Sequence, residues 1–320
     1  MGRRNQPVEE LFANARGGDR AALARLLSLI ERGADEARAI GRLASPLGGR
    51  AYTVGLTGAP GAGKSTLTSA TIGHLRGLGL EVAVLAIDPS SPFTGGAILG
   101  DRVRMQDHAT DPGVFIRSMA TRGHLGGLSL SAPEAIRLLD AIGREWVLVE
   151  TVGVGQVEVE IAGKADTTIV VVNPGWGDSV QANKAGLMEI ADIFVINKSD
   201  RKGSAETQRD LEQMLDLSDL AHEAWRPPIL KAVGTTGQGV PELWDAVLAH
   251  RDFITASGTL AERREFRLRE ELRDIVARRL EQKARALCGG EQWEALQAEV
   301  LHRQLDPWGA ADQMLRGVDA

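Results

Sequence analysis

The sequence predicts an α/β protein in which a mainly parallel sheet is flanked by helices, with further helices at both ends of the chain. Short apolar runs alternate with longer amphipathic stretches across residues 51–256, as in parallel sheets that are covered on both faces. A glycine-rich phosphate-binding motif follows the first apolar run. Residues 1–50 and 257–320 show helical patterns without strand-like runs. We therefore expect an N-terminal helical extension (1–50), a P-loop domain (51–256) and a C-terminal helical arm (257–320).

Composition narrows the class of protein. The chain has 320 residues, of which 43% are hydrophobic, enough for one substantial core with appendages. A net charge of -6 argues against nucleic-acid binding as the main function. The single cysteine, Cys288, excludes a disulfide framework and a cysteine-rich metal site within one chain. We find neither a membrane-spanning run nor a secretory signal, so we expect a cytoplasmic protein without a membrane partner.

The N-terminal extension contains two recognisable helices. Asp19 is placed to cap a helix over Arg20–Arg32, whose leucines and Ile30 share one face, and Gly33 would close it. A second helix is expected at residues 35–43. Proline and glycines at residues 46–49 then break the helical pattern.

Seven apolar runs are candidate strands. They lie at residues 52–56, 82–87, 114–117, 146–149, 168–172, 193–196 and 229–232. Helical stretches separate most of them, which favours parallel pairing.

A phosphate-binding loop follows the first of these runs. The segment Gly58-Ala59-Pro60-Gly61-Ala62-Gly63-Lys64-Ser65 matches G-x-x-x-x-G-K-[ST] at every position, and Thr66 continues it into an expected helix. Glycines let backbone N–H groups converge on phosphate oxygens, and a helix N-terminus favours an anion. We expect Lys64 to neutralise β- and γ-phosphate charge and Ser65 to ligate Mg²⁺.

Acidic residues follow other strands. Glu150 directly follows the run at residues 146–149, where an acid can hold Mg²⁺. Gly153 comes three residues later, where a backbone N–H can sense the γ-phosphate. Most GTPases carry Asp instead of Glu here. Asp88 and Asp101 flank a glycine-rich loop and are further candidates for the metal site, although ordinary turn residues have the same pattern.

A guanine-specificity motif follows the run at residues 193–196. Asn197-Lys198-Ser199-Asp200 matches N-K-x-D, in which the Asp accepts hydrogen bonds that guanine donates and adenine does not. The Asn orders the loop, and the Lys stem covers the base. The loop at residues 173–178 carries Trp176, for which a partner contact and a buried anchor remain equally open.

The C-terminal arm reads as helix. Residues 261–287 carry an apolar stripe that needs a partner surface, formed by Phe266, Leu268, Leu272, Ile275, Val276 and Leu280. Gly289 and Gly290 break this helix, and a second one is expected at residues 291–305.

Four segments together resemble the MeaB/ArgK family, which includes the human methylmalonic aciduria type A protein. They lie at residues 88–105, 117–127, 150–162 and 173–200. The G-A-P-G-A-G-K-S, E-T-V-G-V-G-Q and N-K-S-D motifs are intact, and the resemblance covers essentially the whole chain. It implies a P-loop GTPase of the SIMIBI class that acts as a chaperone for an adenosylcobalamin-dependent acyl-CoA mutase, typically methylmalonyl-CoA mutase. Such proteins gate the loading of intact cofactor and the removal of damaged cofactor.

The resemblance also implies ligands and partners. GTP, GDP and Mg²⁺ are expected, without cobalamin bound by this chain. Hydrolysis should be slow alone and faster with the mutase. A homodimer formed through the arm is expected, and a cobalamin adenosyltransferase is a further candidate partner.

The same resemblance assigns residues by position. Lys64, Asp101, Glu150 and Gly153 belong to catalysis, with Ser65, Asp88, Asp101 and Glu150 around Mg²⁺. Residues 88–101 and 150–160 are the first two switches. Residues 173–184 resemble a third switch toward the mutase, with Trp176, Asp178, Gln181 and Lys184 as candidates. Asn197, Lys198 and Asp200 read guanine, and Ala232 and Val233 would support the base through backbone contacts.

Two enzymatic alternatives remain open. A metal-insertion GTPase would need a metal-ligand cluster, for which only His108 and His124 form a candidate pair. A P-loop kinase for a small metabolite would consume nucleotide only with an acceptor.

Overall fold

The computed structural model describes most of the chain. Described are residues 6–88, 107–120, 127–151, 164–175, 189–217 and 224–316. They form two compact units, residues 1–267 and 268–320, which are treated separately below.

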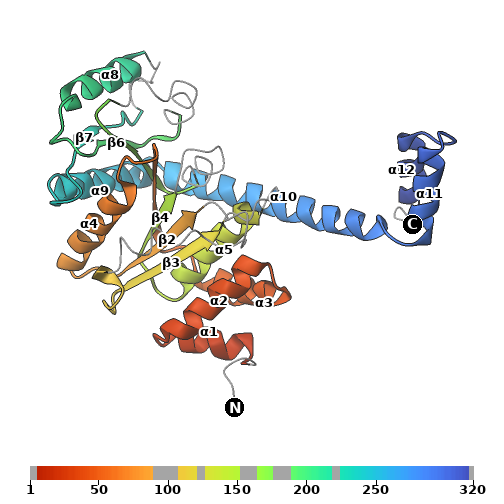
Figure 1. Cartoon of the computed structure of the whole chain (residues 1–320). Coiled ribbons are helices and arrows are strands. Elements are labelled where there is room, and N and C mark those ends of the chain that lie inside the picture. Colours follow the sequence, from red (N-terminus) through yellow and green to blue (C-terminus); the bar gives the residue numbers. More distant parts are fainter. Residues whose placement is uncertain are drawn as a thin grey trace. The chain divides into compact units, whose positions relative to one another are not determined.

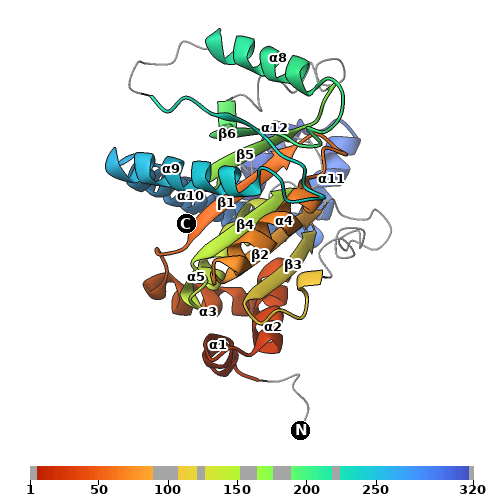
Figure 2. The ribbon, with the colours of Figure 1, turned by 90° about the vertical axis from the view of Figure 1, so that its left-hand side faces the viewer.

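A seven-stranded parallel sheet forms the centre of the first unit (Figure 2). Its strands are β1 (Tyr52–Gly58), β2 (Val82–Asp88), β3 (Val114–Ala120), β4 (Trp146–Thr151), β5 (Thr167–Val172), β6 (Ile193–Ile196) and β7 (Ile229–Lys231). Their order is β3-β2-β4-β1-β5-β6-β7. All seven predicted strands are confirmed, several extended by one to three residues, and β1 lies in the middle between β4 and β5.

Helices cover both faces of this sheet. On one face, α4 (Lys64–Gly77), α8 (Ser204–Asp216) and α9 (Val240–Ala256) contribute to a core that includes Leu67, Leu211 and Trp244. The other face is covered by α5 (Gly127–Ala141) together with the N-terminal helices, which lie beside α5 in Figure 1. The predicted α/β architecture is therefore confirmed as a three-layer arrangement.

The N-terminal helices are part of this second core. They are α1 (Val8–Arg16), α2 (Arg20–Arg32), α3 (Asp35–Ala44) and the short 3-10 helix η2 (Ser45–Leu47). Asp19 caps α2 as expected, accepting hydrogen bonds from Ala21 N (2.8 Å) and Ala22 N (3.2 Å), and Gly33 ends it with a left-handed φ of 64°. Leu26, Leu27 and other apolar residues of these helices pack with α5 and the sheet. The segment predicted as an extension thus completes one face of the sheet.

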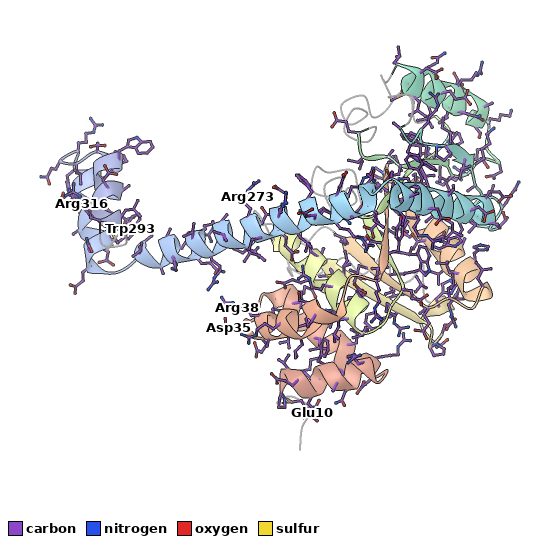
Figure 3. All side chains as sticks on the ribbon, turned by 180° about the vertical axis from the view of Figure 1, so that it is seen from behind. Glu10, Asp35, Arg38, Arg273, Trp293 and Arg316 are labelled. Carbon is purple, nitrogen blue, oxygen red and sulfur yellow. The ribbon has the colours of Figure 1, made fainter. Side chains whose placement is uncertain are left out.

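The second unit contains the rest of α10 (Thr259–Leu287), α11 (Glu291–Leu301) and α12 (Pro307–Leu315). The predicted second helix ends at Leu301 instead of residue 305, because the chain turns at Arg303, whose φ is 59°. Asp306 then caps α12 by accepting hydrogen bonds from Trp308 N and Gly309 N. Figure 3 marks Trp293 on α11 and Arg273 on α10.

The predicted apolar stripe of α10 is exposed in the single chain. Phe266, Leu268, Leu272, Val276 and Leu280 are each at least 50% exposed. Residues 268, 272, 276 and 280 follow one another at four-residue spacing, so they share one face of the helix. A contiguous exposed apolar face of this kind marks an interaction surface.

The first turns of α10 are anchored to the base of the sheet by a buried carboxylate. Asp166, which is 1% exposed and directly precedes β5, accepts hydrogen bonds from Arg264 Nη2 (2.6 Å), Arg264 Nε (3.1 Å) and Arg267. Thr53 N of β1 donates to the same carboxylate (3.0 Å). Burial alone raises the pKa of Asp166, but the hydrogen bonds and charges of the two arginines outweigh burial and lower it below its usual value.

A second polar group lies beside this anchor. Tyr52 Oη contacts Thr167 Oγ1 (2.7 Å), which in turn contacts His250 Nδ1 of α9 (2.8 Å). His250 Nε2 lies 3.2 Å from Asp192, which also pairs with Arg263 of α10 (3.1 Å). Burial raises the pKa of Tyr52 to about 12, so its hydroxyl stays protonated across the physiological range. These contacts fix the amino-terminal ends of the central strands.

We find no apolar helical stretch of membrane-spanning length among the residues that the structure describes.

Replacing Asp166 with Asn should lower the free energy of unfolding by about 3 kcal/mol at neutral pH, because two arginines lose their buried anion. A carboxyl with a lowered folded-state pKa stabilises fully above its ordinary pKa of about 3.9, and this contribution is lost as the pH falls through the lowered value. Urea unfolding measures the difference in free energy of unfolding between wild type and Asp166→Asn. This difference should be constant above about pH 5 and should become smaller under acid conditions.

Arg273→Ala is the control, since the Arg273–Glu270 pair of α10 is largely exposed and should contribute little. If Asp166→Asn lowers the free energy of unfolding by no more than the control variant does, the contact of Asp166 with the two arginines does not stabilise the fold.

Candidate nucleotide-binding site

The candidate site lies at the carboxyl ends of the central strands, where the loops after β1 and β6 lie beside the end of β4. This edge is where ligands bind in open parallel sheets. The loop between β1 and α4 requires glycine at defined positions. Gly58 has a φ of 134°, and a Cβ there would lie 2.0 Å from the carbonyl oxygen of Val171. Gly63 has a φ of 89°, and its Cβ would lie 2.5 Å from Asn197 Nδ2. The motif glycines therefore permit both the turn and the close approach of β5 and Asn197.

Lys64 is held within this loop. Its ammonium group donates to the carbonyl oxygens of Gly58 (2.7 Å) and Ala59 (3.1 Å), and the residue is 7% exposed. Helix α4 begins at Lys64 and has no acidic residue in its first turn. Ala62 is buried and Pro60 and Gly61 are exposed, while Thr66 is half-buried one position beyond Ser65. A buried cation and a helix N-terminus together favour a phosphate group at this loop.

Ser65 and Glu150 form a buried pair of oxygen donors. Ser65 Oγ donates to Glu150 Oε1 at 2.5 Å, and both side chains are at most 5% exposed. Glu150 reaches α4 because it stands opposite Leu56 in the β1–β4 register and faces the same side of the sheet. A hydroxyl and a carboxylate are hard oxygen ligands, which suits Mg²⁺. The residues present thus fit the metal that the motif predicts.

Asn197 joins three segments that are distant in sequence. Its Nδ2 donates to the carbonyl oxygens of Ala62 (2.8 Å) and Gly63 (3.2 Å) of the P-loop. Its Oδ1 accepts from Gly234 N (3.0 Å) in the loop between β7 and α9. The residue is 2% exposed, so these bonds are shielded from water. The predicted loop-ordering role of Asn197 therefore has a defined geometry.

Lys198 and Asp200 lie on the same loop with different surroundings. Lys198 has a left-handed φ of 56°, and its ammonium donates to Gly61 O (2.6 Å), which lays its stem across the mouth of the P-loop. Asp200 is exposed and is available to a base. The guanine-reading roles of Lys198 and Asp200 stay predictions.

Ala232 and Val233 are buried beside this loop, but their N–H groups are already engaged. Ala232 N donates to Ile196 O and Val233 N donates to Gln238 O. The sequence did not identify Gly234 as the partner of Asn197. A Cβ on Gly234 would lie 3.1 Å from Leu67 N, so its small size lets α4 approach. Only a three-dimensional contact reveals this residue, because a lone glycine in a loop has no distinguishing pattern.

Several predicted site residues are not described in the structure. The side chain of Asp88 lies outside the described part, although its backbone ends β2. Also outside it are Asp101, Gly153, Trp176, Asp178, Gln181, Lys184 and His124. Their roles stay predictions.

The metal-ligand cluster that a metal-insertion protein would need is not found among the described residues, where no three His, Cys, Asp or Glu side chains gather suitably. His108 instead contacts Ser69 of α4, with its Nε2 3.1 Å from Ser69 Oγ and 3.0 Å from Ser69 O.

A family model matches most of the chain. Residues 23–288 match the family model described as methylmalonyl Co-A mutase-associated GTPase MeaB. The match extends from α2 to the end of α10 and includes every predicted site residue.

Individual relatives extend the match. A putative GTPase from Pyrococcus horikoshii is 51% identical over 315 residues, which cover 98% of this chain and 99% of the relative. The mouse protein called methylmalonic aciduria type A homolog, mitochondrial, is 32% identical and covers 97% of this chain and 79% of its own length. A crystal structure of an LAO/AO transport system kinase shares 30% identity over the full length of both chains, with a TM-score of 0.72.

Replacing Asn197 with Ala should weaken GDP binding by at least tenfold and lower the free energy of unfolding by about 3 kcal/mol, because three hydrogen bonds of about 1 kcal/mol each are removed, two of them buried. Fluorescent-GDP titration and urea unfolding measure the two effects. Asn14→Ala in α1 is the control, which should leave GDP affinity at the wild-type value. Wild-type affinity in Asn197→Ala would contradict the linking role.

Proposed function

The chain belongs to the MeaB family of GTPases, and we propose that it is a GTP-hydrolysing chaperone for an adenosylcobalamin-dependent acyl-CoA mutase. Membership of this GTPase family supports the hydrolysis of GTP to GDP and phosphate as the reaction. The observation that best supports guanine-nucleotide switching is the link from Asn197 to both the P-loop and the β7–α9 loop. Methylmalonyl-CoA mutase is the proposed client, since the matching family is described by its association with that enzyme. The protein would act in the cytoplasm.

In this proposal the P-loop holds the triphosphate. Its backbone N–H groups and the N-terminus of α4 bind phosphate oxygens, and the Lys64 ammonium neutralises negative charge on the transferring phosphoryl group. Gly153 and Asp101 would complete the catalytic set. The side chain that orients the attacking water is not assigned, in keeping with slow turnover in the absence of a partner.

Ser65 and Glu150 would hold Mg²⁺, with Asp88 and Asp101 from the first switch as further candidates. Mg²⁺, when bound, would supply positive charge that offsets the negative charge developing on the phosphates. The short contact between Ser65 and Glu150 supports this assignment because it brings two suitable oxygens to the start of α4.

Guanine would be read by Asp200, whose carboxylate accepts hydrogen bonds from the N1 and N2 groups of the base. Lys198 would cover the base with its stem, as its contact with Gly61 O supports. Ala232 and Val233 would support the base pocket through their buried side chains, because their backbone N–H and C=O groups already form hydrogen bonds within the protein.

The mutase would be contacted by the segment that carries Trp176, Asp178, Gln181 and Lys184. Nucleotide state would then change affinity for the mutase, and by linkage the mutase would change affinity for the nucleotide by the same factor. GTP would gate the loading of intact adenosylcobalamin and the removal of damaged cofactor, with an adenosyltransferase as the cofactor's source and no cobalamin bound by this chain.

A homodimer is the proposed assembly. The exposed stripe of α10 at residues 268, 272, 276 and 280 supports it, because apolar side chains on one helix face need a covering surface in water. A second copy of the arm supplies an identical face.

A small-metabolite kinase is the alternative that the name of the structural relative raises. The two functions differ in one property: a kinase would need an acceptor molecule and would respond to it instead of to a protein.

Phosphate release from GTP should rise several-fold when a purified adenosylcobalamin-dependent acyl-CoA mutase is added, and ATP should be a poor substrate. The reason is reciprocal coupling between switch segments and the partner. Lys184→Ala should reduce the stimulation, whereas the control variant Lys283→Ala on α10 should keep it. GTP hydrolysis that ignores every mutase tested would remove the proposed client and leave the GTPase.

Replacing Leu272 with Glu should convert a dimer to a monomer, because the charge would be buried without a partner in the apolar contact. Light scattering coupled to size-exclusion chromatography measures the mass. Arg273→Glu, one position away on the same exposed helix, is the control. A wild-type monomer would contradict the assembly.

A further inference from the structure

We propose that Thr57 and Thr151 form a buried hydroxyl clamp that positions Glu150 against Ser65 for GTP hydrolysis. The inference rests on the proposed metal-binding role of Glu150 and Ser65. Neither threonine belongs to the predicted nucleotide or metal set.

The two threonines connect β1 and β4 just beyond the last paired residues of these strands. Backbone pairing between β1 and β4 runs from Tyr52↔Trp146 to Leu56↔Glu150. At the next position Thr151 Oγ1 donates to Thr57 Oγ1 at 3.1 Å, with Leu56 O also within reach at 3.4 Å. The hydroxyls therefore continue the contact between the two strands beyond the register.

Each threonine is also fixed from its other side. Thr57 pairs with Val170 of β5, and Thr151 pairs with Ile87 of β2. Both side chains are 0% exposed, so water does not compete for their hydrogen bond. The clamp thus joins two halves of the sheet at its catalytic edge.

The geometry makes the threonines positioning residues. Successive strand side chains point to opposite faces, so Thr57 and Thr151 face away from α4, whereas Glu150 faces Ser65. Ser65 belongs to the helix that follows β1, and Glu150 belongs to β4. The separation of their oxygens therefore depends on how β1 and β4 are held together at their ends, and site groups must be held within about 0.5 Å of productive geometry.

The test uses Thr57→Val and Thr151→Val, which remove the hydroxyl and keep the branched shape. We expect kcat for GTP to fall about tenfold while KM stays within about twofold, since the loop that binds nucleotide is unchanged. The Mg²⁺ concentration that half-maximally slows release of fluorescent GDP should rise by about fivefold. This second readout measures metal binding and needs no hydrolysis.

Three comparisons make the test specific. The double variant should lose no more kcat or Mg²⁺ affinity than Thr151→Val alone, because Thr151→Val already removes the hydrogen bond that the two threonines share. Thr57→Ser and Thr151→Ser keep the hydroxyl, so each should retain at least half of the wild-type kcat and half of the wild-type affinity for Mg²⁺. Thr71→Val is the matched control: Thr71 is 3% exposed and its hydroxyl donates to Leu67 O within its own helix, so Mg²⁺ dependence should not move.

Wild-type Mg²⁺ dependence in both valine variants would overturn the clamp. The same conclusion follows if Thr71→Val shows an equal shift, or if the serine variants lose as much as the valine variants. Absence of GTP hydrolysis by the wild type would instead contradict the proposed function, while release of fluorescent GDP would still decide the clamp.

Discussion

The nucleotide site depends on one buried amide, because Asn197 supplies the contacts that bring three loops together. It donates to the P-loop after β1 and accepts from Gly234 after β7, while its own backbone N–H bonds to Val172 O at the end of β5. A buried amide that satisfies its donors and acceptor in this way imposes one arrangement, since any other would leave polar groups unpaired. The glycines around it follow from the same constraint, as a Cβ at Gly63 would collide with the amide.

Buried polar groups lie at both ends of the central strands. At their carboxyl ends lie buried polar groups of the candidate site, among them Ser65, Glu150 and Asn197. Their amino ends carry Asp166 and Asp192, which bind arginines of α10. Between these regions the strands are apolar and buried on both faces, which is what a parallel sheet requires.

The sequence predicted those features that are determined by residues close together in the chain. The P-loop, the N-K-S-D motif, the cap at Asp19 and the seven strands each depend on neighbouring residues, and each was predictable. Helix α12 was not among the predicted helices, although Asp306 and Pro307 begin it as its N-cap and first helical residue. The anchor between Asp166 and Arg264 was not predictable, because 98 residues separate the partners and neither has a distinctive setting. Gly234 and the clamp of Thr57 with Thr151 depend in the same way on contacts between distant strands and loops.

The packing of the N-terminal helices has a consequence for synthesis of the chain. Helices α1 to α3 are made first and pack partly on one another, but α2 and α3 also bury apolar surface against α5, and α2 against β3. Strand β1 likewise lacks its pairing partners β4 and β5, which are synthesised roughly a hundred residues later. Non-local pairing of this kind slows folding and leaves apolar surface open in the meantime. The nascent chain should therefore depend on chaperones at the ribosome until β5 has emerged, and a ribosome stalled before that point should present a protease-sensitive N-terminal segment.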